Sequence, residues 1–429
     1  MRAQMEDMSS VDPDLRSPLK SWLGVAAITA SLFTFVTTEM MPVGLLTPMS
    51  AGLHVALGVA GLMVTLYGVS SGLGAPFIVA WTRHVNRRLL LTALLAVLAA
   101  GNLVTAAAPD FALVMAVRLI MGFANGAFWA IGVSMAMRLV PERHANRAAS
   151  IALSGISIAT VAGIPLGTFL AGISSWRTTF LIWSGLSALV LLAVAWTVPS
   201  LPSDNAVPVR EVFNLPRVNA PLRQVMYTVV LYVLGHYSAY TFVRPFMEKD
   251  AHASSAFITG LFMVFGAGGA IGNFAAGYLL KKSLKGTYVA ARALLVLSLL
   301  MLLALGHSQA GAMVAAAVWG LAFGAANLCQ INLVLAGAPD RFEAAMSINT
   351  LGFNVSIALG ALIGGVFADQ AGLSSAVWFG VVLTAASVVV TLGTRRPARV
   401  TPDSAPLPEY ESGSASESAT VETRSSPVR

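Results

Sequence analysis

The sequence has too little charge to build a water-soluble surface. Only 10% of its 429 residues are charged, whereas a soluble domain carries roughly 25%. Hydrophobic residues make up 56% of the chain, and the mean hydropathy is +0.76. The composition therefore excludes the soluble globular classes and predicts a protein that lies in a lipid bilayer.

Cysteine and the motifs of common catalytic sites are also missing. Cys329 is the single cysteine, so no disulfide and no cysteine-based metal cluster can form within one chain. There is no H-E-x-x-H motif, no P-loop and no cluster of metal ligands. Gly68 to Gly72 reads G-V-S-S-G, but this match to the hydrolase motif lies within an expected helix, where glycines serve packing. We expect no enzyme, no metal and no cofactor.

Basic residues are in excess, but they are confined to short connections between apolar runs. The net charge is +7, and the basic clusters occupy every second connection, as the positive-inside rule requires of cytoplasmic loops. The clusters contain Arg83, Arg87, Arg88, Arg138, Arg143, Arg147, Arg210, Arg217, Arg223, Lys281, Lys282 and Lys285. We therefore expect no nucleic-acid partner, and we expect both termini in the cytoplasm.

Apolar runs long enough to cross a hydrocarbon core as helices, about 20 residues each, occur twelve times. The expected spans lie at 21–48, 58–81, 89–108, 111–138, 147–173, 178–198, 222–247, 254–280, 287–306, 311–337, 343–368 and 374–393. The first run is too long for a removable signal peptide and lacks a small-residue cleavage site, so we expect it to remain in the protein.

Polar and proline-rich segments divide the chain into parts. Residues 1–20 are expected to be a cytoplasmic segment, 21–198 a first six-helix bundle and 222–393 a second. Residues 199–221 have the proline content and mixed charge of a cytoplasmic linker. Residues 394–429 are rich in Ser, Pro and Glu, which predicts a disordered cytoplasmic tail.

The two expected bundles are similar in sequence. Glycines match at an offset of 198, and further residues match at 197, in corresponding spans. The pairs are Gly68 and Gly266, Gly74 and Gly272, Gly122 and Gly320, Gly126 and Gly324, Ser150 and Ser347, Gly155 and Gly352, Gly163 and Gly360, and Gly167 and Gly364. Two parallel repeats predict a pseudo-twofold axis along the membrane normal, with a cavity between the repeats.

Four segments carry a family resemblance. They are TTEMMPVGLL (37–46), RLIMGFANGAFW (118–129), GIPLGTFLAGISSWRTTF (163–180) and GHYSAYTFVRPF (235–246). With them, residues 20–395 resemble the major facilitator superfamily, in particular its drug and sugar proton antiporters, and most of all bacterial sugar efflux transporters of the arabinose-efflux type. The resemblance implies an all-α protein of the inner membrane, with twelve helices in two bundles, that exports small sugars by proton antiport. We expect it to act as a monomer, with the proton gradient as its energy source.

One loop departs from the family pattern. Where the superfamily has G-x-x-x-D-R-x-G-R-R, this chain has VAWTRHVNRR, so Arg83 takes the place of the aspartate. We infer a reversed polarity, in which Arg83, Arg87 or Arg88 pairs with Asp340 or Glu343, and Lys281 or Lys282 pairs with Glu142. Such pairs would latch the cytoplasmic gate. The alternative is that these charges only set topology, since exposed ion pairs contribute about 0–1 kcal/mol.

Glu39 is the one carboxylate that we expect deep inside a span, and Arg118 is the one arginine that we expect at such depth. At 1.5 Å per residue, Glu39 lies ~13 Å and Arg118 ~10 Å below the outer surface. An acid in hydrocarbon must face a cavity, find a partner or hold its proton. We interpret the two as a proton-coupling pair; the alternative is a static pair that fixes helix packing.

Several polar and aromatic side chains have the chemistry of a sugar site. His236 and Tyr240 share one face of the seventh span, with Tyr237 adjacent. The other candidates are Asn125, Trp129, Asn327, Gln330, Asn332 and Asn354. For any one asparagine alone, a contact between helices is the favoured interpretation, whereas the group together predicts a polar cavity. We read Arg244, near the outer end of the span, as an anchor whose head reaches the membrane surface.

Gly163, Pro165 and Gly167 form a G-x-P-x-G segment inside the fifth span. Proline removes a helical hydrogen bond and glycine allows close packing, so we expect a kinked helix that helps the bundles move. The alternatives to sugar export are efflux of phenicol-type drugs or of nucleosides. A passive facilitator or a membrane sensor is opposed by the buried Glu39.

Overall fold

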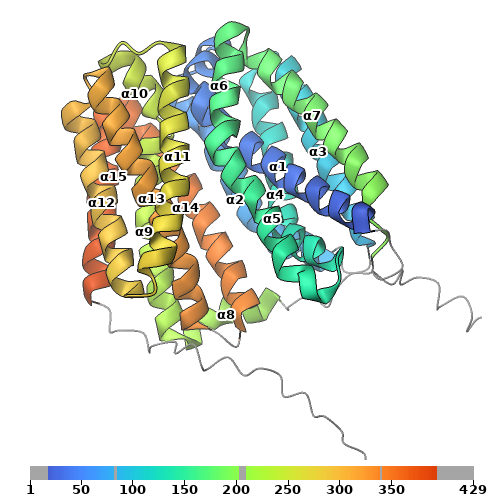
Figure 1. The fold of residues 1–429 in the computed structure, drawn as a ribbon. Helices are drawn as coiled ribbons and strands as arrows, with labels where there is room; N and C mark the ends of the chain where they lie inside the picture. Colours follow the sequence, from blue (N-terminus) through green and yellow to red (C-terminus); the bar gives the residue numbers. More distant parts are fainter. Residues whose placement is uncertain (1–17, 82–84, 202–208, 339–340, 394–429) are drawn as a thin grey trace, which may run out of the picture. The chain divides into compact units, whose positions relative to one another are not determined.

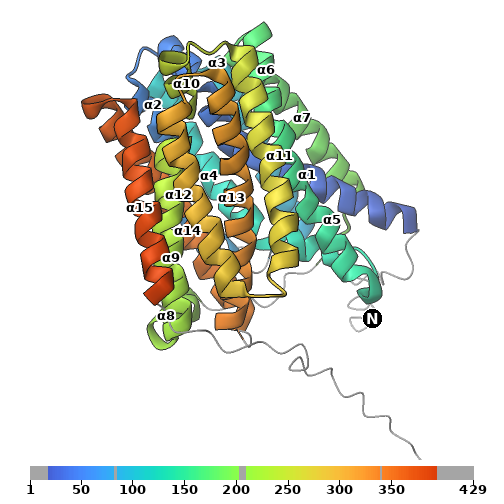
Figure 2. The ribbon, with the colours of Figure 1, turned by 60° about the vertical axis from the view of Figure 1, so that its left-hand side comes forward.

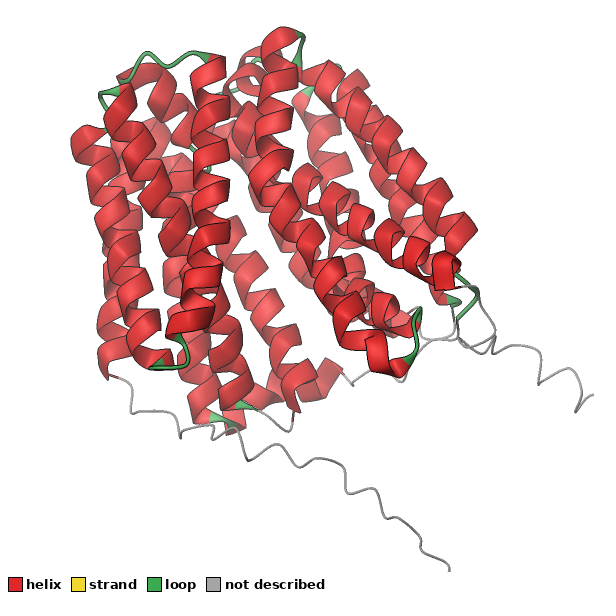
Figure 3. Cartoon of the chain, in the orientation of Figure 1, coloured by secondary structure: helices red, strands yellow, loops and turns green. Residues whose placement is uncertain are grey.

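The computed structural model describes residues 18–81, 85–201, 209–338 and 341–393. In these ranges every regular element is a helix (Figure 3). The first half contains α1 (Pro18–Gly52), α2 (Leu57–Trp81), α3 (Arg87–Ala107), α4 (Phe111–Arg138), α5 (Ala145–Ile158), α6 (Ile164–Ile173) and α7 (Trp176–Thr197). The second contains α8 (Val209–Val218), α9 (Ala220–Tyr240), α10 (Val243–Asp250), α11 (Ser255–Leu279), α12 (Leu284–Leu305), α13 (Gln309–Gly337), α14 (Phe342–Ala371) and α15 (Leu373–Gly393).

The helices agree with the expected spans, apart from two local differences. Eleven helices within the described residues are long and apolar enough to cross a membrane, with α5 and α6 counted as one. The seventh expected span, 222–247, is divided at Thr241 into α9 and the short helix α10. Because α9 still has 21 residues, about 32 Å of helix, it is long enough to be the twelfth helix that crosses the membrane. The prediction of an all-α membrane protein with twelve crossing helices in two bundles is confirmed.

Short polar side chains begin many of these helices. The first N–H groups of a helix have no partner within it, and a Ser, Asn or Asp side chain just before the helix can accept from one of them. Such caps are made by Asn86, Asp110, Ser175, Asn219, Ser254, Ser283 and Ser308. Each cap lies in a connection, so polar residues set the length of each apolar helix.

The helices pack into two bundles (Figures 1 and 2). In the first, α2 packs on α4, α3 on α7, and α1 on both α5 and α7; in the second, α11 packs on α13, α12 on α13, and α9 on α14 and α15. The largest contacts between the bundles are α2 with α14 and α6 with α11, and α1 also contacts α10. The helix α8 lies in the connection between the bundles, and Leu215 packs it against α9 and α13.

Equivalent close contacts within the two bundles support the predicted sequence repeat. A Cβ added to Gly122 in α4 would lie 2.5 Å from the backbone oxygen of Tyr67 in α2. A Cβ added to Gly320 in α13 would lie 1.9 Å from that of Phe265 in α11. Both members of the contact are 198 residues apart in the sequence. The glycines matched in the sequence therefore serve the same purpose in each bundle: they let two helix backbones touch.

Candidate functional site

Among the residues that the structure describes, Glu39 is the deep carboxylate, and one neutral side chain donates to it. Glu39 lies in α1 and is 6% exposed. Asn125 of α4 donates from Nδ2 to its Oε2 at 3.2 Å, and the same amide nitrogen donates to the Ser71 hydroxyl of α2 at 3.0 Å. Asn125 therefore connects three helices at the acid. Sequence reasoning proposed Asn125 as a substrate ligand, whereas here it orients the carboxylate.

Arg118 is bound beside Glu39 rather than to it. Nη1 of this fully buried arginine donates to the backbone oxygen of Thr38 at 2.9 Å, and its guanidinium carbon lies 5.2 Å from the centre of the Tyr67 ring. Within the described residues, Arg118 makes no ion pair with Glu39. Its Nε and Nη2 also find no hydrogen-bond partner there. The two charges are neighbours, but each keeps its own neutral partner.

A proline explains why the Thr38 oxygen is available. A helical residue donates its N–H to the oxygen four residues earlier, and proline has no N–H. Pro42 lies inside α1, so the oxygen of Thr38 lacks its helical donor. A buried carbonyl without a donor costs about 1–3 kcal/mol. The side chain of Arg118 supplies the missing donor.

The same device occurs once more in α1, with an arginine of the other bundle. Pro48 frees the oxygen of Gly44, and Nη1 of Arg244 in α10 donates to that oxygen. Arg244 is 5% exposed, and its Nε also pairs with Glu248 at 2.9 Å. The expectation that Arg244 extends to the membrane surface is wrong, because an uncompensated carbonyl lies within its reach.

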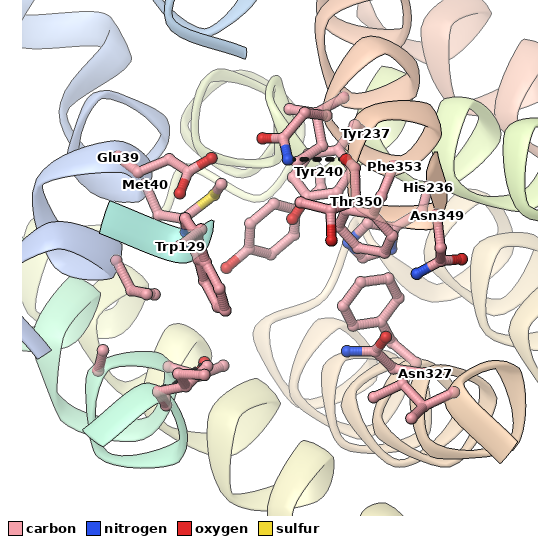
Figure 4. A pocket seen from close by; sticks show the side chains of 18 of the residues that line it. Glu39, Met40, Trp129, His236, Tyr237, Tyr240, Asn327, Asn349, Thr350 and Phe353 are labelled. Atoms are coloured by element: carbon pink, nitrogen blue, oxygen red, sulfur yellow. Dashed lines mark hydrogen bonds between the residues drawn. The ribbon is translucent and has the colours of Figure 1, made fainter. Parts of the chain in front are cut away.

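A cavity of about 310 Å³ lies between the bundles, and Glu39 lines it (Figure 4). Six other residues singled out from the sequence line it as well: Trp129, His236, Tyr237, Tyr240, Asn327 and Asn354. The remaining lining residues are Val36, Met40, Leu153, Ile156, Ala159, Thr160, Ile164, Phe265, Phe323, Ile331, Met346, Asn349, Thr350, Phe353 and Ile357. The site is therefore largely aromatic and aliphatic, with polar groups on few positions.

His236 is fixed within a group of rings. Trp319 of α13 donates from its indole nitrogen to Nδ1 of His236 at 3.0 Å. The imidazole stacks on Phe323 at 3.8 Å between centroids, and Tyr240 stacks at 5.1 Å. Because Nδ1 accepts a hydrogen bond, this nitrogen carries no hydrogen. His236 and Tyr240 line the cavity on the side opposite Glu39 (Figure 4).

Two predicted polar residues have roles that the sequence did not indicate. Gln330 does not line the cavity; it is fully buried and donates to Asn349, which does. Asn332 donates to the backbone oxygen of Leu328 within its own helix. Asn349 was missed by the sequence analysis, because a single asparagine in an apolar run does not reveal which way it faces.

The fifth expected span is irregular where glycine and proline occur. A π-helical segment, Ala159–Gly163, separates α5 from α6. A Cβ at Gly163 would lie 2.2 Å from the Thr37 hydroxyl oxygen, and Gly167 faces Met41. Pro165 lies in the first turn of α6, where its missing N–H is tolerated. This segment thus packs closely against α1 near Glu39.

Only part of the inferred latch falls within the described residues, and that part lies at the end of the molecule where α1 begins. Arg83 and Asp340 are outside the described residues, as is the side chain of Glu343. Arg88 donates to the backbone oxygen of Ala195 in its own bundle, and Arg87 is buried. Glu142 and Lys281 are exposed. The latch stays a prediction.

Polar contacts join the bundles at the opposite end, where α1 ends. Besides the bond from Arg244 to Gly44, Asp369 of α14 accepts from the N–H of Gly58, the second residue of α2, at 2.8 Å. Thr168 and Thr259 share a hydrogen bond of 2.9 Å between α6 and α11. The cavity instead extends along the halves of α5, α13 and α14 that lie toward the start of α1, since Leu153, Ile331 and Met346 line it.

Comparisons with known proteins give matches over most of the chain. The family model of the Major Facilitator Superfamily matches residues 27–344. The structure of the human organic anion transporter MFSD10 (TETRAN) is similar, with a TM-score of 0.66 and 18% identity over 88% of this chain and 100% of that one. The structure of a bacterial homolog of the human lysosomal transporter Spinster, in an inward-facing and unoccupied conformation, is also similar. Its TM-score is 0.65, with 14% identity over 88% of this chain and 95% of that one. At these identities the two structures indicate the fold alone.

Proposed function

Because this chain belongs to the major facilitator superfamily, and is therefore a multi-pass membrane transporter of small molecules rather than an enzyme, we propose that it exports sugars or sugar-like solutes in exchange for protons. The observation that carries the proposal is Glu39, a buried carboxylate that lines the cavity and forms no ion pair with any cation in the described part of the chain. A carboxylate in that position can take up and release a proton without breaking an ion pair.

Coupling requires that proton and solute each change the affinity of the other. Glu39 and the rings of His236 and Tyr240 face the same cavity of about 310 Å³. A solute that fills this space excludes water from around the carboxylate, and loss of water disfavours its charged form. Solute and proton are thereby linked through one cavity, while Arg118 stays bound to the neighbouring backbone oxygen.

A sugar-like solute suits the distribution of groups in the cavity. Ring faces of Tyr240 and Phe323 offer flat apolar contact, and the amides of Asn327, Asn349 and Asn354 offer hydrogen bonds to hydroxyl groups. Phenicol-type drugs or nucleosides form the second candidate class, because aromatic and aliphatic side chains make up most of the lining. Both classes combine hydroxyl groups with an apolar face.

The conformation fits one stage of alternating access. Charge distribution in the loops puts the start of α1 in the cytoplasm, and we extend this to both termini and to a bacterial inner membrane. The bundles are joined by Arg244, Asp369 and Thr168 at the other end. In this arrangement the protein is inward-facing, with its outer gate closed. We propose that the monomer carries out the full cycle.

Transport in proteoliposomes tests the coupling. Counterflow of radiolabelled L-arabinose, lactose, uridine and chloramphenicol identifies the solute, and a pH gradient then drives its accumulation. In Glu39→Gln we expect accumulation to be lost while counterflow exchange persists, because the proton carrier is gone but the cavity remains. Asp250→Asn, at the closed end in α10, serves as the matched control. Undiminished gradient-driven flux in Glu39→Gln would contradict the proposal.

A further inference from the structure

A second buried arginine lies in the second bundle, and the sequence analysis did not find it. Arg292 of α12 is fully buried. Its guanidinium carbon lies 3.6 Å from the ring centre of Tyr288 and 4.7 Å from that of Tyr232. Nη1 donates to the Thr391 hydroxyl at 2.7 Å, whereas Nε and Nη2 have no hydrogen-bond partner within the described residues. Nη1 also donates to the backbone oxygen of Ser387 at 3.3 Å, and the two ring faces stabilise the charge further.

From Tyr232, whose ring faces Arg292, a series of hydrogen bonds leads to the cavity. The hydroxyl of Tyr232 in α9 donates to Oε1 of Gln330 in α13. Nε2 of Gln330 donates to Oδ1 of Asn349 in α14 at 2.6 Å. Tyr232 and Gln330 are fully buried, and Asn349 is 5% exposed and lines the cavity. The series therefore ends on a group that a solute can touch.

The direction of this series determines what Asn349 offers. If Tyr232 accepted from Gln330 instead of donating, the Gln330 amide would be reversed and Asn349 would turn its oxygen to the cavity. A cation over the face of a phenol withdraws electron density, which makes the hydroxyl a better donor and a poorer acceptor. Arg292 therefore favours the observed direction. Figure 4 shows the Asn349 nitrogen on the cavity side and its oxygen turned away.

We propose that Asn349 determines specificity by presenting N–H donors to an oxygen of the solute, and that the three residues behind it are positioning residues that fix its amide. The inference rests on the proposed transport function and deepens it. The preferred solute carries an acceptor oxygen, such as a hydroxyl or ether of a sugar, at the point that meets α14. Gln330, predicted from the sequence as a ligand, acts through Asn349.

Methyl β-D-galactoside and its monodeoxy and monofluoro derivatives test this, as competitors of lactose counterflow. A deoxy position has no acceptor, whereas fluorine accepts weakly and cannot donate. If Asn349 donates, the wild type prefers the fluoro over the deoxy derivative at one position. In Asn349→Ala we expect the KM for methyl β-D-galactoside to rise roughly three- to tenfold, which is the range for one lost uncharged hydrogen bond. Vmax should stay within about twofold of the wild-type value. The preference at that position should vanish.

Tyr232→Phe tests the positioning role, because it keeps the ring over Arg292 and removes only the hydroxyl. The Asn349 amide is then free to turn, so the difference between fluoro and deoxy derivatives should shrink while Vmax is kept. Tyr288→Phe is the matched control. The Tyr288 ring also faces Arg292, but Tyr288 is not part of the hydrogen-bonded series from Tyr232 to Asn349, so this variant should behave as wild type. Two results would overturn the role of Asn349 but leave the transport proposal standing. In the first, the wild type transports galactosides and Asn349→Ala keeps the same preference for fluoro over deoxy derivatives. In the second, Tyr232→Phe and Tyr288→Phe lose this preference equally. If the wild type transports L-arabinose but no galactoside, the deoxy and fluoro derivatives of that pentose replace the galactosides in the same test. A wild type that transports neither sugar would refute the sugar proposal and this inference together.

Discussion

The bond between Arg244 and the Gly44 oxygen predicts how strongly the closed end is held. It joins the two bundles, and it satisfies a carbonyl that Pro48 leaves without a donor. A hydrogen bond from a charged group contributes about 1.5–3 kcal/mol. If it exists only while this end is closed, Arg244→Met shifts the equilibrium toward opening roughly 10- to 150-fold. Pro48→Ala should shift it less, because a helical N–H then competes for the same oxygen.

Spin-label distances measure this equilibrium. With Cys329 replaced by Ser, labels at Ala56 and His307 report the separation of the bundles, since both positions are exposed in connections at the closed end. Arg244→Met should add a population at longer distance. Arg177→Met is the control, because Arg177 binds the Ala108 oxygen within one bundle.

A separate variant isolates the carbonyl contact from the ion pair on the same arginine. Glu248→Gln removes the ion pair but leaves the Gly44 bond; its side chain is 26% exposed, so it should cost less. A distance distribution in Arg244→Met that is unchanged from wild type would refute the reasoning, as would an equal effect of Glu248→Gln.

Three further outcomes are expected. Gly320→Ala places a methyl group 1.9 Å from a backbone oxygen of α11 and should lower the melting temperature by several degrees, whereas Gly352→Ala, with nothing within 4 Å, should leave it unchanged; equal Tm values would contradict the packing. Asn125→Ala removes the donor to Glu39 and should reduce gradient-driven transport roughly tenfold, on the scale of one hydrogen bond to a charged group, with the protein still folded by circular dichroism. Cys329 is fully buried and should resist maleimide in the native protein but react after denaturation.

Much of the fold was predictable because the bilayer constrains it strongly. A chain that crosses hydrocarbon must satisfy its backbone within each segment, so apolar length alone locates helices. The seventh span differed, since its end turns at Thr241 into a separate short helix. The sequence there, TFVRPF, carries an arginine and a proline, but only the neighbouring bundle explains why that arginine turns inward.

The sequence predicted how deep the site residues lie in the membrane, but not which way their side chains point. Glu39 was found because it is the one acid in an apolar run, and in the structure it lines the cavity. Asn125 and Gln330 were placed at the right level but contact other side chains instead of the cavity. Sequence reasoning gave Arg118 as the single deep arginine, and Arg292 corrects that statement. The direction in which a side chain points depends on packing between helices, which a single sequence does not contain.

The two proline-freed oxygens of α1 have a mechanical consequence. Thr38 is fastened to a guanidinium of its own bundle, and Gly44 to one from the opposite bundle. These anchor points are six residues apart, about 9 Å along the helix axis. In the proposed cycle, in which the bundles move against each other, we expect α1 to bend within that short interval, which contains Glu39.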